Sequence, residues 1–250
     1  MIIYQIQAAL KFRPRLRKKA PKENGQSSMI TALLPVKRFD RSKERLAGFL
    51  SASERVELAR TMFLDVWTVL NQLLASKQLD RLLVISAEPC VLAQCRRDGI
   101  EFVEESVQQS HSESVISATR YALATGTRTL LSVPIDTPGV RPDEILSLLQ
   151  LRYEYRVVIV PSADGTGSNA LLRTPPDAIA PHFGPGSCEL HAREAAANGH
   201  SCLVHQCAGF AADIDTPEDL RVFAALERPC RTLQLVRSYL GVDRGVTSCL

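Results

Sequence analysis

Short apolar runs alternate with amphipathic stretches along most of the chain. The first apolar run, Ile30–Val36, is followed by a polar loop and then by apolar residues that recur every three or four positions from Val56 to Leu73. In front of that segment, Ser51 and Glu54 have the spacing of a helix capping box. The pattern therefore predicts a buried first strand followed by an amphipathic helix.

The same alternation continues to about residue 226. The apolar runs predict further strands at 81–86, 100–103, 129–133, 157–160, 170–173 and 202–205. The amphipathic stretches predict helices at 89–97, 113–124, 142–151, 187–198 and 216–226. From about residue 231 the obvious periodicity is lost, which favours a C-terminal appendage at 229–250. We therefore expect an α/β fold with one domain at 29–228, in which a mostly parallel sheet lies between helices.

Composition and charge exclude several classes of protein. Of the 250 residues, 45% are hydrophobic and 23% are charged, which excludes a largely disordered or fibrous chain. No run reaches the ~18 apolar residues of a membrane helix. The formal net charge of +3 is concentrated at 1–28, where seven Lys and Arg face one Glu. The rest of the chain is mildly acidic, so its charge gives no reason to expect nucleic-acid binding.

The N-terminal segment and the cysteines bear on location. Segment 1–28 is basic and poor in acids, which we interpret as a disordered tail or an extension before a start near Met29; an organelle transit peptide is the alternative. The chain has seven cysteines without a tight framework and shows no secretory signal. Reduced thiols in a cytoplasmic protein are the simplest interpretation.

Polar side chains follow several of the predicted strands. Lys37, Ser86, Asp136 and Asp164 come at or just after the ends of separate strands. Because the carboxyl ends of parallel strands share one edge of a sheet, we expect a ligand site at that edge.

Three aspartates form the first candidate constellation. Asp136 follows a predicted strand, and Asp213 and Asp215 are two residues apart, so that in an extended segment they point the same way. Three converging carboxylates need a cation, and hard oxygen ligands suit Mg²⁺. The alternative is that Asp215 and Thr216 cap the last helix, with Pro217 in its first turn. The residues alone leave both interpretations open.

Two glycine-rich segments are candidates for binding phosphate. Asp164–Asn169 follows a strand, so its N–H groups could hold a phosphate or a ribose, although no Lys follows the last glycine as in a P-loop; a plain turn is the alternative. In Phe183–Ser187, the glycines permit close approach of a ligand to the start of a helix, where Ser187 and free N–H groups suit a phosphate. The alternative is an ordinary N-cap at Ser187.

Two further clusters are weaker. Lys37, Lys43 and Arg45 could hold a triphosphate, or they form a solvated charge run. A Cys/His group loosely resembles zinc-ligand spacing, but structural cysteines and surface histidines are the favoured interpretation. Its members are Cys188, His191, His200, Cys202, His205 and Cys207.

Six motifs occur in order between Met29 and about Leu226. They are Pro35-Val-Lys-x-Phe with Ser42-Lys-x-Arg-Leu46, Leu50-Ser-x-x-Glu-Arg55, Pro134-x-Asp-x-Pro138, Asp164-Gly-Thr-Gly-x-Asn169, Phe183-Gly-Pro-Gly-Ser187 and Asp213-Ile-Asp-Thr-Pro-Glu-Asp-Leu220. Together they resemble the phospholactate guanylyltransferases of deazaflavin coenzyme F-420 biosynthesis, which include users of phosphoenolpyruvate and 3-phosphoglycerate.

This resemblance implies a Rossmann-like, GT-A-like nucleotidyltransferase that transfers GMP from GTP to the phosphate of a three-carbon acid and releases pyrophosphate. It implies that Asp136, Asp213 and Asp215 hold one or two Mg²⁺, and that Asp136, Lys37 and Lys43 are catalytic. The nucleotide-binding residues expected on this basis are Pro35, Lys37, Lys43, Arg45, Ser86, Asp164, Gly165 and Asn169. The acid-binding residues expected are Thr166, Gly167, Ser168, Phe183, Gly184, Gly186 and Ser187. GTP and the acid are the expected partners, with no nucleic acid or membrane; a homodimer is one candidate assembly.

The chain departs from the family pattern at four places. Thr137-Pro138-Gly139 stands for Leu-Pro-Leu, Ser114-Val115 for Leu-Asn, Ser168 for Thr and Cys188 for an aromatic residue. Thr137 and Cys188 are smaller or more polar than the usual residues, which would tolerate an extra substrate hydroxyl. We therefore expect 3-phospho-D-glycerate to be preferred over phosphoenolpyruvate or 2-phospho-L-lactate.

Two alternatives stay open. One is a related nucleotidyltransferase for a sugar phosphate or a pterin cofactor, but those enzymes usually carry a glycine-rich basic loop after the first strand, and Lys37–Asp40 has no glycine. The other is a non-catalytic nucleotide-binding or zinc-binding module. The presence of all three aspartates argues against it.

Overall fold

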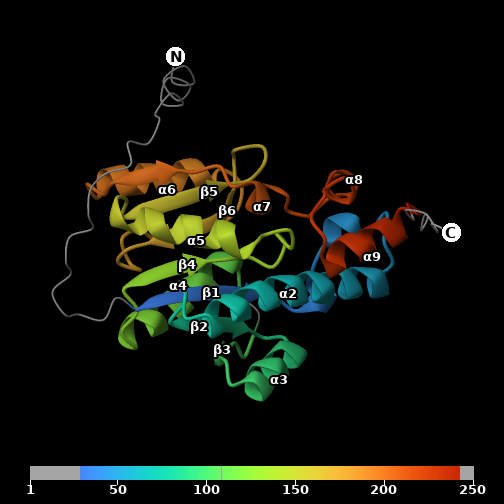
Figure 1. Ribbon diagram of the computed structural model, residues 1–250, viewed down its shortest axis with the longest axis horizontal. Helices are drawn as coiled ribbons and strands as arrows, with labels where there is room; N and C mark the ends of the chain where they lie inside the picture. Colours follow the sequence, from blue (N-terminus) through green and yellow to red (C-terminus); the bar gives the residue numbers. More distant parts are fainter. Residues whose placement is uncertain (1–28, 108, 243–250) are drawn as a thin grey trace, which may run out of the picture.

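The computed structural model describes residues 29–107 and 109–242. Its centre is a seven-stranded sheet with the order β3-β2-β1-β4-β6-β5-β7 (Figure 1). The strands are β1 (Ile30–Val36), β2 (Arg81–Ser86), β3 (Glu101–Glu104), β4 (Thr129–Ser132), β5 (Val157–Pro161), β6 (Ser168–Arg173) and β7 (Cys202–Val204). Only β6 pairs antiparallel with its neighbours within the described sheet, so the prediction of a mostly parallel α/β sheet is confirmed.

Helices cover both faces of this sheet. They are α2 (Ala52–Ala75), α3 (Pro89–Asp98), α4 (His111–Ala124), α5 (Pro142–Gln150), α6 (Ser187–Ala197), α7 (Ala208–Ala211), α8 (Pro217–Ala224) and α9 (Arg231–Tyr239), with short 3-10 turns η2 (Phe39–Arg41), η3 (Glu44–Leu46) and η4 (Leu151–Tyr153). Alternate strand residues point to opposite faces. Leu34 and Val158 therefore pack in the cluster that contains residues of α2 and α5, whereas Leu33 packs on α4 and Ile159 on α6.

Two helix starts show why their positions follow from the sequence. Ser51 caps α2 through the expected capping box with Glu54. A second capping box joins Ser110 and Glu113, so α4 begins at His111, two residues before the predicted start. Each box satisfies backbone N–H groups that the first helical turn leaves without partners. The shift of α4 matters because it places the His111 side chain at the carboxyl edge of the sheet.

The Gly-rich segment 164–168 lies in a hairpin. β6 starts at Ser168, two residues earlier than predicted, and returns antiparallel to β5. Ser168 and Asn169 are therefore strand residues, and their side chains point to opposite faces. This geometry sends Ser168 toward α6 and Asn169 toward α7, as their hydrogen bonds to His191 and to the carbonyl oxygen of Phe210 show.

The expectation that periodicity ends near residue 231 is wrong. Helix α9 lies alongside α2 (Figure 1), and its Leu233 and Val236 belong to the same buried cluster as the core of α2. Leu235, Tyr239 and Leu240 pack against the same cluster while partly exposed, so the buried stripe of this short helix is narrow and the sequence pattern is weak. Burying side chains such as Leu233 and Val236 contributes about 1.5–3 kcal/mol each.

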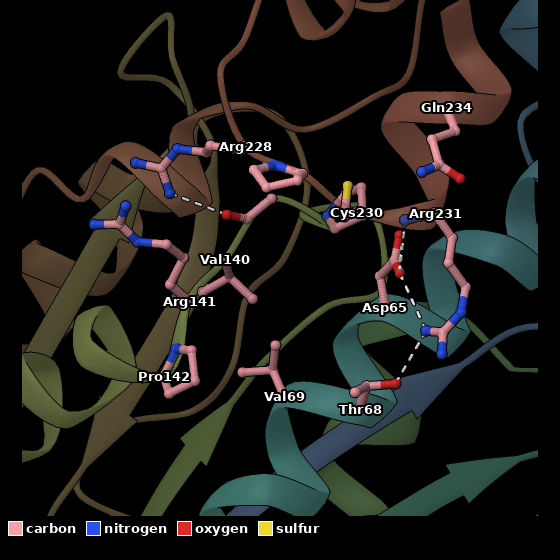
Figure 2. Close-up of a pocket in the computed structure, with 13 residues that line it drawn as sticks. Asp65, Thr68, Val69, Val140, Arg141, Pro142, Arg228, Cys230, Arg231 and Gln234 are labelled. Atoms are coloured by element: carbon pink, nitrogen blue, oxygen red, sulfur yellow. Dashed lines mark hydrogen bonds and ion pairs between the residues drawn. The ribbon is translucent and has the colours of Figure 1, made fainter. Parts of the chain in front are cut away.

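A buried carboxylate on α2 fixes the start of α9. Asp65 accepts hydrogen bonds from the Thr232 N–H and hydroxyl, both at 2.7 Å, and from the Arg231 N–H at 3.2 Å. Figure 2 shows the Arg231 side chain reaching back to Asp65 and Thr68. The Asp65 side chain is only 6% exposed. This buried carboxylate of α2 therefore takes the place of water as the acceptor for the first N–H groups of α9.

Within residues 29–107 and 109–242, none of the helices combines the length and the hydrophobicity needed to span a bilayer. The predicted tail at 1–28 lies outside the described residues, as do residues 243–250 of the predicted appendage.

We predict that Asp65→Ala lowers the free energy of unfolding by about 2–3 kcal/mol, because it leaves buried donors of α9 without an acceptor. Urea unfolding followed by circular dichroism measures this loss. As a matched control, Glu189→Ala removes an exposed acid paired with Arg193 and should cost less than about 0.5 kcal/mol. Equal losses in the two variants would contradict the role of Asp65.

Candidate active site

The three predicted aspartates are brought together by one backbone contact. The Ile214 N–H donates to the Asp136 carbonyl oxygen at 3.1 Å, so the 213–215 segment runs beside the loop that follows β4. Ile214 itself is fully buried in the core. In an extended segment its two neighbours, Asp213 and Asp215, then point the other way, toward the side of Asp136.

Lys43 lies between two of these carboxylates. Its Nζ is 2.7 Å from Asp215 Oδ1 and 3.5 Å from Asp136 Oδ2, and its side chain is 6% exposed. Burial acts to lower the pKa of Lys43, but the two carboxylates outweigh it and raise that pKa above its usual value. Arg45 approaches Asp215 at 3.9 Å from the solvent side. Lys43 is therefore a buried cation at the aspartates, and the solvated-charge alternative is wrong for it.

Asp213 is the aspartate of this group that has a neutral partner, Asn169, in place of a cation. Asn169 donates to its Oδ1 at 3.0 Å and also to the Phe210 carbonyl oxygen at 2.7 Å. Burial raises the pKa of Asp213; the Asn169 hydrogen bond opposes that shift, while Asp136 and Asp215 add to it. For Asp215, burial also acts to raise the pKa, but Lys43 lowers it below the usual value. In the described structure, Lys43 and Arg45 thus form ion pairs with Asp136 and Asp215 and not with Asp213.

The helix-cap alternative accounts for only part of this segment. Thr216 is the N-cap of α8 and forms a capping box with Asp219. The Asp215 side chain takes no part in that box and pairs with Lys43 instead. Capping therefore explains Thr216 and leaves the side chains of Asp136, Asp213 and Asp215 for other chemistry.

The donor set fits a hard divalent cation. All three side chains are carboxylates, two of them already share one cation, and the third has a raised pKa. As arranged around Lys43, however, no group of three His, Cys, Asp or Glu side chains in the described parts of the chain is placed to hold a metal ion. The Mg²⁺ assignment stays a prediction.

The side chains of the hairpin loop mostly shape the loop itself. Asp164 accepts from the Ser162 hydroxyl and from the Thr166 N–H and hydroxyl, and these hydrogen bonds lower its pKa to about 2. Gly165 has a φ of 76°, which a residue with a side chain rarely adopts. The Gly167 N–H donates to Ser162 Oγ. The turn alternative thus accounts for Asp164 and Gly165, whose expected nucleotide contacts remain predictions.

The hairpin touches the start of α6. The Cys188 N–H donates to the Thr166 carbonyl oxygen at 3.1 Å, so the two glycine-rich segments form one surface. Gly186, with a φ of 74°, is the N-cap residue of α6 and has no side chain to cap with. Ser187 is the next residue, and its buried hydroxyl has no hydrogen-bond partner. The N-cap alternative for Ser187 is therefore wrong, and its hydroxyl is buried without a partner among the described residues.

Phe183 and Gly184 link this surface to α4. The Phe183 N–H donates to Ser112 Oγ at 2.9 Å, and the His111 ring packs edge-on against the Phe183 ring with centroids 4.6 Å apart. Gly184 has a φ of 125°. These contacts fix the loop that leads into α6.

The remaining predicted residues lie around the end of β1. Pro35 is buried within β1, and Lys37 is exposed directly after it. The Ser86 hydroxyl donates to the Val36 carbonyl oxygen at 2.7 Å and accepts from the Glu88 N–H. Because Ser86 uses its donor inside the protein, its expected nucleotide contact has little support.

Two histidines lie where the sequence pattern did not indicate them, His111 at the site and His191 in the interior. Burial lowers the pKa of His111 to about 4, and Asp136 and Lys37 are its charged neighbours. The Ser110–Glu113 capping box was the signal for its position. His191 was expected at the surface but is completely buried. The expectation of a surface histidine is wrong there.

Thr137 and Cys188, two of the departures from the family pattern, both have buried side chains. Thr137 is fully buried and its hydroxyl faces the Pro134 carbonyl oxygen at 3.4 Å, so it offers no free group to a substrate. Cys188 lies beside Ser187 at the start of α6. The Cys188 side chain packs in the buried cluster between α6 and strands β5 and β6. The substrate expectation thus loses its support at Thr137 and stays a prediction.

A pocket of about 560 Å³ lies away from these residues, beside α2 and α9 (Figure 2). Asp65, Arg228 and Cys230 are among its lining residues, and Arg228 and Asp65 are both engaged in ion pairs. It contains none of the predicted site residues. The carboxylate edge, with its free hydroxyl and buried cation, is the better candidate site.

Comparisons with known proteins show the family of the chain. The family described as "Guanylyl transferase CofC like" matches residues 30–226. A phosphoenolpyruvate guanylyltransferase from Conexibacter woesei is 35% identical over 76% of this chain and 84% of its own. A 2-phospho-L-lactate guanylyltransferase from Methanothermobacter thermautotrophicus is 33% identical (76% and 81%), and a 3-phospho-D-glycerate guanylyltransferase from Colwellia psychrerythraea is 31% identical (79% and 92%).

A solved structure supports the fold independently. A candidate nucleotide-diphospho-sugar transferase from Desulfovibrio desulfuricans G20 superposes with a TM-score of 0.70 at 17% identity, over 86% of this chain and 97% of its own. The predicted nucleotidyltransferase fold is therefore confirmed. Together with the family match, it establishes that the chain is an enzyme that belongs to the CofC-like guanylyl transferases.

Proposed function

We propose that this enzyme transfers GMP from GTP to the phosphate of a three-carbon phospho-acid, releasing pyrophosphate, in coenzyme F-420 biosynthesis. The observation that carries the proposal is the cluster of Asp136, Asp213 and Asp215 at the carboxyl edge of the sheet, with the buried Lys43 ammonium between Asp136 and Asp215. The names of the family's curated relatives, which specify phosphoenolpyruvate, 2-phospho-L-lactate or 3-phospho-D-glycerate, support the class of acceptor.

The proposed reaction depends on offsetting the repulsion between two anionic substrates and needs no proton transfer to an enzyme base. A phosphate monoester has a second pKa of about 6, so the acceptor is largely a dianion at neutral pH and needs no general base. The obstacle is repulsion between that dianion and the triphosphate. Lys43, held charged at the aspartates, and Lys37 and Arg45 at the solvent side offset this repulsion and favour the leaving pyrophosphate.

Asp136, Asp213 and Asp215 would hold Mg²⁺, which supplies further positive charge to the phosphate oxygens. Lys43 lies between Asp136 and Asp215, and its positive charge offsets the repulsion between these two carboxylates. We propose that the start of α6 binds the acceptor's phosphate, and the unpaired Ser187 hydroxyl there supports this proposal.

The preferred acid is proposed to be 3-phospho-D-glycerate. The support is local: Cys188 stands where relatives of this kind are expected to carry an aromatic residue, and the free Ser187 hydroxyl lies next to it. A substrate hydroxyl that becomes buried needs such a partner.

We predict that Asp136→Asn lowers kcat/KM for GTP by at least about 100-fold, because the charge that faces Lys43 and the cation is lost. Pyrophosphate release measures the rate, and thermal unfolding checks that the Tm stays within a few degrees. Asp143→Asn, an exposed acid paired with Arg141 on α5, is the control and should keep full activity. Near-normal turnover of Asp136→Asn would overturn the proposed role.

For the acid, we predict that purified enzyme with GTP and Mg²⁺ forms the guanylyl adduct of 3-phosphoglycerate with a kcat/KM at least about tenfold above those for phosphoenolpyruvate and 2-phospholactate. Mass spectrometry identifies the adducts in separate reactions. A strong preference for phosphoenolpyruvate would contradict the substrate proposal and leave the transferase intact. No adduct in any reaction, with folded protein and intact GTP, would overturn the proposed function.

A further inference from the structure

The ring of His191 is held at both nitrogens. His191 lies on α6 and is completely buried. Its Nε2 is 2.7 Å from the His182 backbone nitrogen, and its Nδ1 is 3.0 Å from Ser168 Oγ. Neither the proposed chemistry nor a surface role accounts for a histidine in this position.

The identity of these partners fixes the proton on the ring. A backbone N–H can only donate, so Nε2 must accept. Burial, with His182 and Arg173 nearby, lowers the pKa of His191 to about 4, so the ring is neutral at pH 7. A neutral imidazole that accepts at Nε2 carries its proton at Nδ1. His191 therefore donates to Ser168 Oγ.

This donation leaves the Ser168 hydroxyl with one function. Its oxygen accepts from His191, and its own hydrogen has no acceptor among the described residues. Ser168 is half-buried at the first position of β6, next to the hairpin loop that contacts the start of α6. The unpaired hydroxyl of Ser187 lies at that same helix start. The Ser168 hydrogen is therefore available to a group that accepts a hydrogen bond.

We propose that His191 is a positioning residue that holds the Ser168 hydroxyl as a donor toward an anionic oxygen of the phospho-acid. Carboxylate and phosphate oxygens only accept hydrogen bonds, so a hydroxyl fixed as a donor favours them over groups that must donate. With the opposite ring tautomer, Ser168 would have to donate to the ring and could not serve an anion. The inference rests on the proposed function, which supplies the acid.

A purely structural role for His191, tying α6 to β6, makes a different prediction from this one. A structural residue would affect the enzyme whether or not Ser168 carries a hydroxyl. A residue that acts through Ser168 loses its effect once that hydroxyl is gone. A double-mutant cycle read on the KM of the acid therefore separates the two.

The experiment measures kcat and the KM values for GTP and for the acid in five variants. Ser168→Ala and His191→Phe should each raise the acid KM roughly 10–100-fold and leave the GTP KM within about twofold. The double variant should be no worse than Ser168→Ala by more than about twofold. Ser168→Thr and His191→Gln, which keep the required donors and acceptors, should stay within about fivefold of wild type.

The matched control is His182→Gln, which changes an exposed ring close to His191 but keeps the backbone N–H that His191 accepts from. It should leave both KM values unchanged. In parallel, ¹⁵N NMR of the wild-type ring, with no substrate present, should show Nδ1 protonated and Nε2 unprotonated at pH 7. This measurement also tests the inference if His191→Phe does not fold.

Independent effects in the double variant, or a ring protonated at Nε2, would overturn the inference while the transferase activity stands. A wild type that uses none of the three acids would overturn the proposed function, and the inference with it. The two failures are therefore distinguishable.

Discussion

The site depends on the compensation of charge between one ammonium and a group of carboxylates. A buried ammonium loses several kcal/mol of hydration, and one carboxylate 4 Å away near a protein surface returns about 4 kcal/mol. Lys43 contacts both Asp136 and Asp215, which lie 79 residues apart in the chain. It can stay charged and buried only while the loop after β4 and the segment before α8 remain side by side. The Ile214–Asp136 backbone bond and the buried Ile214 side chain hold them there.

The rest of the fold serves this arrangement. β1, β2 and β4 run parallel, so the loops after their carboxyl ends open on one edge. The antiparallel β6 enters that edge with its first residues, and these are the ones that reach it: Asn169 bonds to Asp213, while Ser168 faces His191. Helix α6 begins at the same place, with a hydroxyl that no protein group satisfies. A single antiparallel strand thus connects the acidic group with the helix start.

The sequence predicted the positions of helices and strands better than the tertiary contacts of their side chains. The apolar runs of β1, β2 and β5 and the capping box at Ser51 were strong local signals, and the structure agrees with them. Helix α9 was missed because its anchor, Asp65, lies 166 residues earlier, where no local pattern connects them. The partners of the aspartates could not be predicted either, since Lys43 reaches them through a left-handed backbone position in a loop. His191 was expected at the surface together with the other histidines of the Cys/His group, whereas tertiary packing buries it completely.

The hydroxyl groups near the candidate site fall into two kinds, those with an acceptor in the protein and those without one. Most buried polar atoms of a protein have hydrogen-bond partners, whereas the proposed acid site needs donors that stay available. Ser86 and Thr137 are of the first kind, since their hydroxyls bond to backbone carbonyl oxygens. Ser168 and Ser187 are of the second kind, because neither hydroxyl has a protein acceptor in the described structure. In water-poor surroundings such a donor is costly until an anion arrives. That cost favours a bound carboxylate or phosphate over empty space, which is the selectivity that an acceptor site for a phospho-acid requires.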